Sequence, residues 1–240
     1  MRPFDATKIF QVLPALLPYL SVTLLMMLGT VFTGGLLGFM LARAKLSKRR
    51  FLRTLAGGYT AALRCTPSVV LLFIVYYGLP ELIMGLFGIN INFIDKGLFV
   101  LITFALLFAA SMSEVMRSAY LAVDRGQREA ALSIGMSEAQ CLFRITLPQA
   151  VVFALPNFSN ALINLMKEGS LAYTIGLIDV MGQGNLIISR NYGAHALETY
   201  LALAIIYWTL TLLLQYTFGA IERRLSRGRK SVTAQEDVWN

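Results

Sequence analysis

Residues 9–42 read IFQVLPALLPYLSVTLLMMLGTVFTGGLLGFMLA, a stretch that contains no charged side chain. A helix needs roughly 20 consecutive apolar residues to cross a hydrocarbon core about 30 Å thick, and this stretch is longer. Pro14 and Pro18 lie in its first part, where proline favours a break or an interfacial lead-in over one straight helix. We therefore predict an amino-terminal segment outside the membrane over residues 1–18 and a first crossing over residues 19–41.

Four more apolar stretches are long enough to cross a membrane. They cover residues 59–79, 97–113 with a continuation to 119, 145–166 and 199–221. The second stretch carries Arg64 near its start and is predicted to stop at the Gly-Leu-Pro sequence of residues 78–80. The fourth is predicted to be broken by Pro156 and closed by Lys167 and Glu168. The pattern predicts an all-α integral membrane protein with about five transmembrane helices.

The composition supports this class of protein. Of the 240 residues, 57% are hydrophobic and 14% are charged, whereas an ordinary soluble domain is about one quarter charged. So little polar surface cannot coat a soluble particle of this size. The formal net charge of +8 is interpreted as membrane topology and attraction to anionic lipid, so the lipid bilayer is an expected partner and nucleic acid is not.

Basic residues gather in three places and predict the orientation, because cytoplasmic flanks collect lysine and arginine. The loop after the first crossing holds Arg43, Lys45, Lys48, Arg49, Arg50 and Arg53. Further basic residues lie between the third and fourth crossings and after the fifth. An amino end outside and a carboxyl end inside places all three in the cytoplasm. Residues 19–225 then form the transmembrane domain, and residues 226–240 form a polar cytoplasmic tail.

Gly34 and Gly38 in the first crossing have a spacing that lets another helix approach closely. We interpret them as residues of helix packing within the chain. A contact between two subunits is the alternative.

The loop over residues 124–148 contains a pattern with fixed spacing. Glu129-Ala130-Ala131 is followed by Gly135, then by Ile145, and then by Leu147-Pro148. The pattern predicts a short helix over residues 127–134 that ends at Gly135, whose missing β-carbon suits a left-handed turn. A second helical stretch is predicted over residues 137–143, and Pro148 falls early in the next membrane helix. Such a short first helix is not stable alone in water, so we expect a partner to hold it.

This spacing resembles the EAA signature of ATP-binding cassette (ABC) importer permeases. The similarity continues outside the loop, where it is to permeases of polar amino acids. It includes Arg64-Cys65-Thr66-Pro67, Tyr76-Tyr77-Gly78-Leu79-Pro80, Glu114, Arg117, Gly126-Gln127, Leu147-Pro148-Gln149-Ala150, Ala154-Leu155-Pro156, Asn160 and Lys167-Glu168 with Ser170-Leu171. It covers roughly residues 19–225 and departs from the family pattern at Cys65 and at Gly169.

The resemblance implies a type I ABC importer permease (MetI-like) fold in the bacterial plasma (inner) membrane. It also implies three partners: a second permease subunit, identical or closely related, a cytoplasmic ABC ATPase dimer, and an extracytoplasmic amino-acid-binding protein. The ATPase-coupling residues that it implies are Gln127, Glu129, Ala130, Ala131, Gly135, Ile145, Leu147 and Pro148. Closure of the ATPase dimer then moves this loop and switches the path between its inward-facing and outward-facing states.

We expect the chain itself to be non-catalytic and to need no cofactor. Its sequence has no phosphate-binding loop for ATP, no pair of catalytic carboxylates and no nucleophile motif. A single histidine, His195, argues against a multi-histidine metal site.

Ionisable residues near the crossings mark candidate functional positions, because burying an unpaired charge there costs several kcal/mol. Arg64 is interpreted as snorkelling to the cytoplasmic interface, and Glu114 and Arg117 as an internal pair on one helix face. Residues 169–178 are too short to cross and are interpreted as a broken or re-entrant piece at a gate. The candidate path or gate residues are Arg64, Thr66, Pro67, Glu114, Asn160, Lys167, Glu168 and Ser170.

The predicted substrate class is polar amino acids. Residues 192–198, Tyr-Gly-Ala-His-Ala-Leu-Glu, resemble permeases of cystine and other sulfur amino acids, while arginine, histidine and glutamine stay open. A secondary transporter is a remote alternative, because inverted repeats or more crossings would be expected and an EAA loop would have no purpose there. An intramembrane enzyme would need clustered His, Asp or Glu ligands, or a nucleophile with its base.

Overall fold

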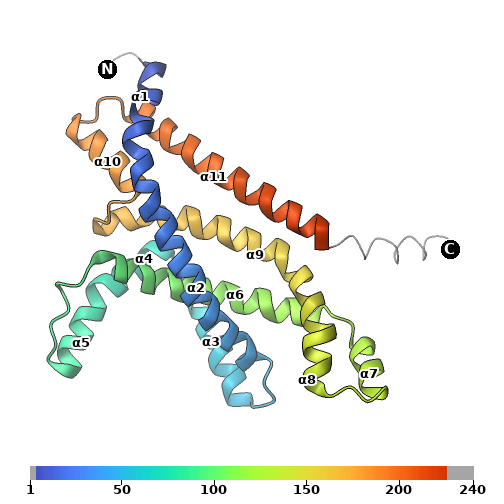
Figure 1. Ribbon diagram of the computed structural model, residues 1–240. Helices are drawn as coiled ribbons and strands as arrows, with labels where there is room; N and C mark the ends of the chain where they lie inside the picture. Colours follow the sequence, from blue (N-terminus) through green and yellow to red (C-terminus); the bar gives the residue numbers. More distant parts are fainter. Residues whose placement is uncertain (1–3, 226–240) are drawn as a thin grey trace.

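The structure, a computed structural model, describes residues 4–225 of the 240-residue chain. Within that part every regular element is helical, and five segments are long and apolar enough to cross a membrane (Figure 1). They are Ala6–Lys45, Ser68–Phe87, Lys96–Leu121, Glu138–Ile175 and Ala196–Leu225. The prediction of an all-α membrane protein with about five crossings is confirmed. The predicted tail, residues 226–240, lies outside the described residues.

The first span is built from two helices that follow one another. Helix α1, Ala6–Leu16, contains Pro14 without ending there. A 3₁₀ turn, Leu17–Tyr19, carries Pro18 and separates α1 from α2, Leu20–Lys45. The predicted position thus has one turn of tighter helix, but the helix runs on through it as one candidate span, Ala6–Lys45, and the external segment over residues 1–18 stays a prediction.

The second span differs from the prediction at its start. Helix α3, Arg50–Cys65, ends in front of Pro67, because proline disfavours the helical conformation in the residue before it. The segment long and apolar enough to cross is Ser68–Phe87 and not residues 59–79. Arg64 therefore lies in the last turn of α3, before the span, rather than near the start of a crossing.

The end of the second span also differs from the prediction. The span consists of α4, Ser68–Phe73, a π turn, Ile74–Gly78, and α5, Leu79–Phe87. The stop predicted at the Gly-Leu-Pro sequence is wrong, because Pro80 lies in the first turn of α5. A missing N–H is tolerated there because the helix changes its hydrogen-bonding pattern in the π turn directly before α5, and such local adjustments compensate for proline in membrane helices. Helix α5 ends at Gly88, which has a left-handed φ of +69°.

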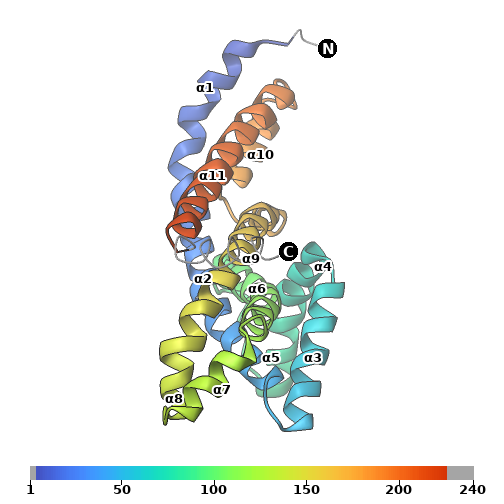
Figure 2. The same ribbon diagram turned by 90° about the vertical axis from the view of Figure 1, so that its right-hand side faces the viewer.

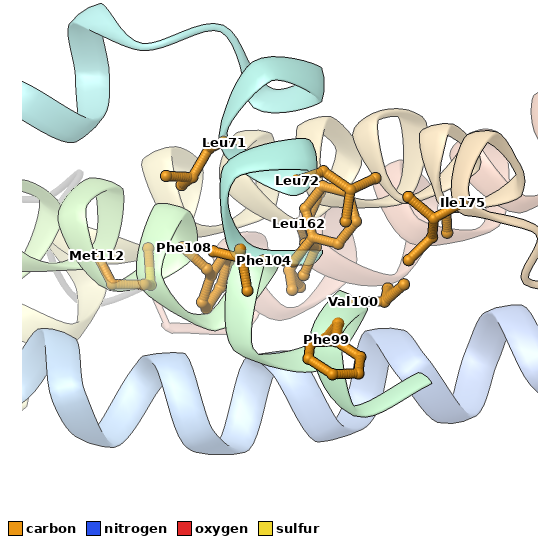
Figure 3. Packing of buried hydrophobic residues seen from close by; sticks show 12 residues of the cluster. Leu71, Leu72, Phe99, Val100, Phe104, Phe108, Met112, Leu162 and Ile175 are labelled. Carbon is orange, nitrogen blue, oxygen red and sulfur yellow. The ribbon is translucent and has the colours of Figure 1, made fainter. Parts of the chain in front are cut away.

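Helix α6, Lys96–Leu121, is the centre of the fold. Its extent confirms the predicted third crossing and its continuation to residue 119. Figure 3 shows buried apolar side chains from α4, α6 and a later helix, α9 (Leu147–Gly169), packed together around it. The cluster contains Leu71, Leu72, Val75, Phe99, Val100, Phe104, Phe108, Met112, Leu162, Leu165, Ala172 and Ile175.

Helices α2 and α6 approach each other closely at two glycines. A β-carbon on Gly34 would lie 2.8 Å from the carbonyl oxygen of Ala105. One on Gly38 would lie 2.8 Å from Cβ of Met112. The interpretation of these glycines as packing residues within the chain is confirmed.

Helix α9 passes Pro156 without interruption, so the break predicted there is wrong. A proline in a membrane helix frees one backbone carbonyl, and neighbouring helices help to compensate for it. Here α6 and the last helix, α11 (Ala196–Leu225), both pack against α9. Lys167 and Glu168 lie in the last turn of α9, as predicted.

The segment after α9 leaves the α-helical conformation. Ser170–Ile175 is a 3₁₀ helix that ends at Gly176, and α10, Val180–Arg190, follows. The predicted departure from a regular α-helix over residues 169–178 is present, but Ser170–Ile175 continues the fourth span; its role at a gate stays a prediction, and α10 was not foreseen. Figures 1 and 2 show α10 beside α1 and the start of α11, at the end of the molecule where the chain begins. A second buried cluster joins these helices and contains Leu16, Val180, Ala202, Leu203 and Ile206.

Candidate functional site

A polar groove lies between the end of α3, helix α6 and helix α9, with a volume of about 480 Å³. Five of the eight candidate path residues line it, namely Arg64, Thr66, Glu114, Asn160 and Glu168. These residues come from three separate parts of the chain: the end of α3 with the turn after it, α6 and α9. The structure thus brings together most of the residues selected from the sequence, and their role in transport stays a prediction.

The other three candidates, Pro67, Lys167 and Ser170, are next to or near lining residues in the sequence but do not line the groove. Pro67 is the residue before α4 and sets the break between α3 and the second span. The Ser170 hydroxyl donates a hydrogen bond to the Lys167 carbonyl oxygen at 2.6 Å, at the end of α9.

Helix α9 contributes a polar stripe that sequence reasoning found only in part. Asn157, Asn160, Asn164 and Glu168 all line the groove and are spaced three, four and four residues apart, so they share one helix face. At a rise of 1.5 Å per residue the stripe is about 16 Å long. Asn157 and Asn164 were missed. The signal that could have found them is this helical spacing of amides in an otherwise apolar stretch.

Helix α6 contributes Ser111, Glu114 and Ser118 to the opposite wall. The Glu114 carboxylate accepts two hydrogen bonds from Arg117, from Nε at 3.0 Å and from Nη2 at 2.8 Å. The predicted internal pair is confirmed. Glu114 also accepts a hydrogen bond from Lys45 Nζ at 2.7 Å, which sequence reasoning missed because it assigned Lys45 to a basic loop.

Arg64 and Glu168 differ from Glu114 in that their side chains have no hydrogen-bond or ion-pair partner among residues 4–225. Both side chains are exposed along the groove. The groove therefore offers one free positive and one free negative charge, together with amide and hydroxyl groups that donate and accept hydrogen bonds. An amino acid carries the complementary carboxylate and ammonium, and hydrogen bonds to such charged groups are the strong ones.

The loop with the EAA pattern forms two short helices. Helix α7, Arg125–Ser133, starts two residues earlier than predicted, because the Asp124 carboxylate accepts a hydrogen bond from the Gly126 N–H at 2.7 Å. Helix α8, Glu138–Cys141, begins at Ser137 with a capping box. A π turn, Leu142–Thr146, leads from α8 into α9.

Gly135 ends α7 in the predicted left-handed turn, with φ at +87°. Its N–H donates to the Leu132 carbonyl oxygen at 3.0 Å, and the Met136 N–H donates to the Ala131 carbonyl oxygen at 3.1 Å. These two bonds form the Schellman motif, which occupies carbonyl groups that a helix end leaves free. The conformation of this turn therefore sets the direction in which the chain leaves α7.

Two side-chain contacts hold α7 in place. The Gln149 amide in α9 donates to the Gln127 side-chain oxygen, and the Arg128 guanidinium pairs with Glu138 in α8, with Nε at 3.1 Å. The hydrogen bond and the charge of Glu138 raise the pKa of Arg128 above its usual value. Ala131 is buried against the chain, so one face of α7 packs inward.

Much of the remaining surface of the loop is exposed. Gln127, Glu129 and Ala130 are exposed, as are two large apolar side chains, Ile134 at 80% and Phe143 at 65%. Exposed apolar side chains rimmed by polar ones are typical of a protein interaction surface.

Comparison with known proteins gives the family. The family described as "Binding-protein-dependent transport system inner membrane component" matches residues 34–227. This chain belongs to that family. The permease is 38% identical over 237 residues to the L-cystine transport system permease protein TcyL of Bacillus subtilis (strain 168), covering 99% of this chain and 98% of that protein. It is also 34% identical over 221 residues to the arginine transport system permease protein ArtQ of the same organism. That match covers 92% of this chain and 97% of ArtQ.

Solved structures agree with this assignment. The permease matches a chain of an amino acid ABC transporter, described as "with histidines", with a TM-score of 0.80 and 30% identity, over 93% of this chain and 100% of that one. A chain of the inward-facing MetNI methionine ABC transporter matches with a TM-score of 0.71 and 19% identity, over 90% of this chain and 99% of that one. At this low identity the match shows the fold alone. The predicted ABC importer fold and the role as an amino-acid permease subunit in the inner membrane are confirmed.

Proposed function

We propose that this permease imports cystine or a related sulfur amino acid through the groove. The groove carries the proposal, because its free Arg64 and Glu168 match the carboxylate and ammonium of an amino acid and its three asparagines can bind further polar atoms. The similarity to TcyL and the sequence of residues 192–198 favour cystine. The similarity to ArtQ makes arginine the main alternative, with histidine and glutamine after it.

We also propose that the loop over residues 124–148 couples the permease to a cytoplasmic ATPase dimer. Its exposed face, with Glu129, Ile134 and Phe143, supports this docking role. The contact between Gln127 and Gln149 supports transmission to α9, whose polar stripe lines the groove. Closure of the ATPase dimer then moves α7 and α9 together and changes the groove.

The remaining partners follow from the same proposal. A second permease subunit, identical or related, covers the groove side where Arg64, Asn164 and Glu168 are exposed, and an extracytoplasmic binding protein delivers the amino acid. The lysine and arginine distribution supports an amino end outside and a carboxyl end in the cytoplasm. This orientation is tested together with the coupling loop, because a cytoplasmic ATPase can bind α7 only if the loop faces the cytoplasm.

Uptake of labelled cystine by cells that carry the complete transporter tests the substrate. Excess unlabelled cystine should compete strongly, and histidine or glutamine should compete poorly. Glu168→Gln should weaken uptake about tenfold or more, because hydrogen bonds to charged groups contribute about 1.5 to 3 kcal/mol.

The control is Glu222→Gln, which makes the same change at an exposed carboxylate outside the groove and should leave uptake within about twofold, since exposed charges contribute little. If arginine or glutamine competes as well as cystine, the sulfur-amino-acid proposal is wrong and the family assignment is unaffected.

A further inference from the structure

We propose that Lys45 is a specificity-determining residue of the groove, because it withdraws the Glu114 carboxylate from the charges available to a substrate. The inference rests on the proposed function, import of an amino acid through the groove. Lys45 lies at the end of α2, behind Glu114, and is not among the residues that line the groove. It would therefore act on the substrate through Glu114.

The surroundings of Lys45 are those of a fixed, buried cation. Its side chain is 5% exposed, and Nζ donates to Ser113 Oγ and to Glu114 Oε1, each at 2.7 Å. The Ser113 hydroxyl donates its own proton to the Ala110 carbonyl oxygen at 2.8 Å, so it accepts from Lys45. A buried ammonium is costly without an anionic partner, and Glu114 is the carboxylate paired with it here.

Both oxygens of the Glu114 carboxylate are occupied by cations of the protein. Oε1 accepts from Lys45, and Oε2 accepts twice from Arg117. The Glu114 side chain is 29% exposed and lines the groove, so a substrate passes it. An ammonium group on the substrate would have to displace one of these cations to bind there. Glu168, which has no such partner among residues 4–225, is the free carboxylate.

This arrangement sets the balance of charge that a substrate meets. Arg64, Lys45 and Arg117 are the cations in or behind the groove, and Glu114 and Glu168 are the carboxylates. An excess of positive charge disfavours a substrate with a net positive charge relative to a zwitterion of similar size. Specificity is the difference between two affinities, so one unit of charge directly behind the groove should change it. Removing the Lys45 charge should shift the preference toward cationic amino acids.

The test is a series of three variants measured in the complete transporter. The readout is the ratio of two inhibition constants, for arginine and for an uncharged amino acid, against labelled substrate. Lys45→Met should shift the ratio toward arginine by about three- to tenfold, the effect of one charge several ångströms away in a partly hydrated site. Glu114→Gln should shift it in the opposite direction. The double variant, which restores the charge balance, should return it to within about twofold of the original.

The series separates an electrostatic role from a structural one, because the ratio does not depend on how much protein is made. Lys48→Met is the matched control. It removes the charge of an exposed lysine three residues after Lys45, between α2 and α3, and should leave the ratio of inhibition constants unchanged. Shifts of the same sign in Lys45→Met and Glu114→Gln, or no shift in either, would overturn the proposal. Failure of the unmodified transporter to take up any amino acid would instead contradict the proposed function.

Discussion

Gly135→Val is expected to leave the permease in the membrane and to reduce uptake roughly tenfold. A residue with a β-carbon in the left-handed conformation costs about 1 to 2 kcal/mol, and a β-branched one is a particular outlier. At Gly135 φ is +87°, and no heavy atom lies within 4 Å of the position a β-carbon would take. The effect therefore comes from the backbone and not from crowding. The chain leaving α7 changes direction, and the ATPase should dissociate more readily, as measured by co-purification.

Gly88→Val is the matched control for this change. Gly88 also ends a short helix, has φ at +69°, and has open space around it, but it follows α5 and lies far from the coupling loop in the sequence. It should leave ATPase association intact. If Gly135→Val keeps full uptake and full ATPase association, the loop is not a coupling element.

Gly34→Val is expected to lower the thermal unfolding temperature of the detergent-solubilised permease by roughly 3 to 10 °C. Its side chain would meet the Ala105 carbonyl oxygen at 2.8 Å and Cβ of Phe108 at 3.2 Å, so α2 and α6 would have to separate. Overpacking of this kind typically costs about 1 to 3 kcal/mol, and about 1 kcal/mol shifts the midpoint by roughly 2 to 4 °C in a chain of this size.

The neighbouring glycine gives the comparison. Gly35 lies on the same helix, and no heavy atom lies within 4 Å of the position of its β-carbon. Gly35→Val should therefore change the midpoint by no more than about 1 °C, because surface substitutions usually have small effects. Equal midpoints for the two variants would show that α2 and α6 are not in the close contact described here.

The features that the sequence predicts well depend on residues close together in the chain. Apolar runs long enough to cross a membrane, and the turn at Gly135, are local properties that no distant contact needs to supply. The errors at the second span and at Pro156 have a different origin. Proline ends a helix at Pro67 and is accommodated at Pro80 and Pro156, and the difference depends on the position in the helix and on neighbouring helices.

The groove could be anticipated only in part. Its residues were selected one by one as polar groups near apolar spans, but their meeting depends on how α3, α6 and α9 pack. Lys45 shows the limit most clearly, because the sequence places it in a basic cluster with Lys48, and only the packing of α2 against α6 shows that it is buried beside Glu114.

ATP-driven uptake is the most direct test of the account. Vesicles should contain the permease with its ATPase, and the amino-acid-binding protein should be supplied on the opposite face, with proton and sodium gradients collapsed by ionophores. Labelled amino acid should accumulate when ATP is present on the ATPase side and should not accumulate without it. In parallel vesicles without ionophores and without ATP, accumulation driven by an imposed ion gradient would contradict ATP-driven import and would favour a secondary transporter.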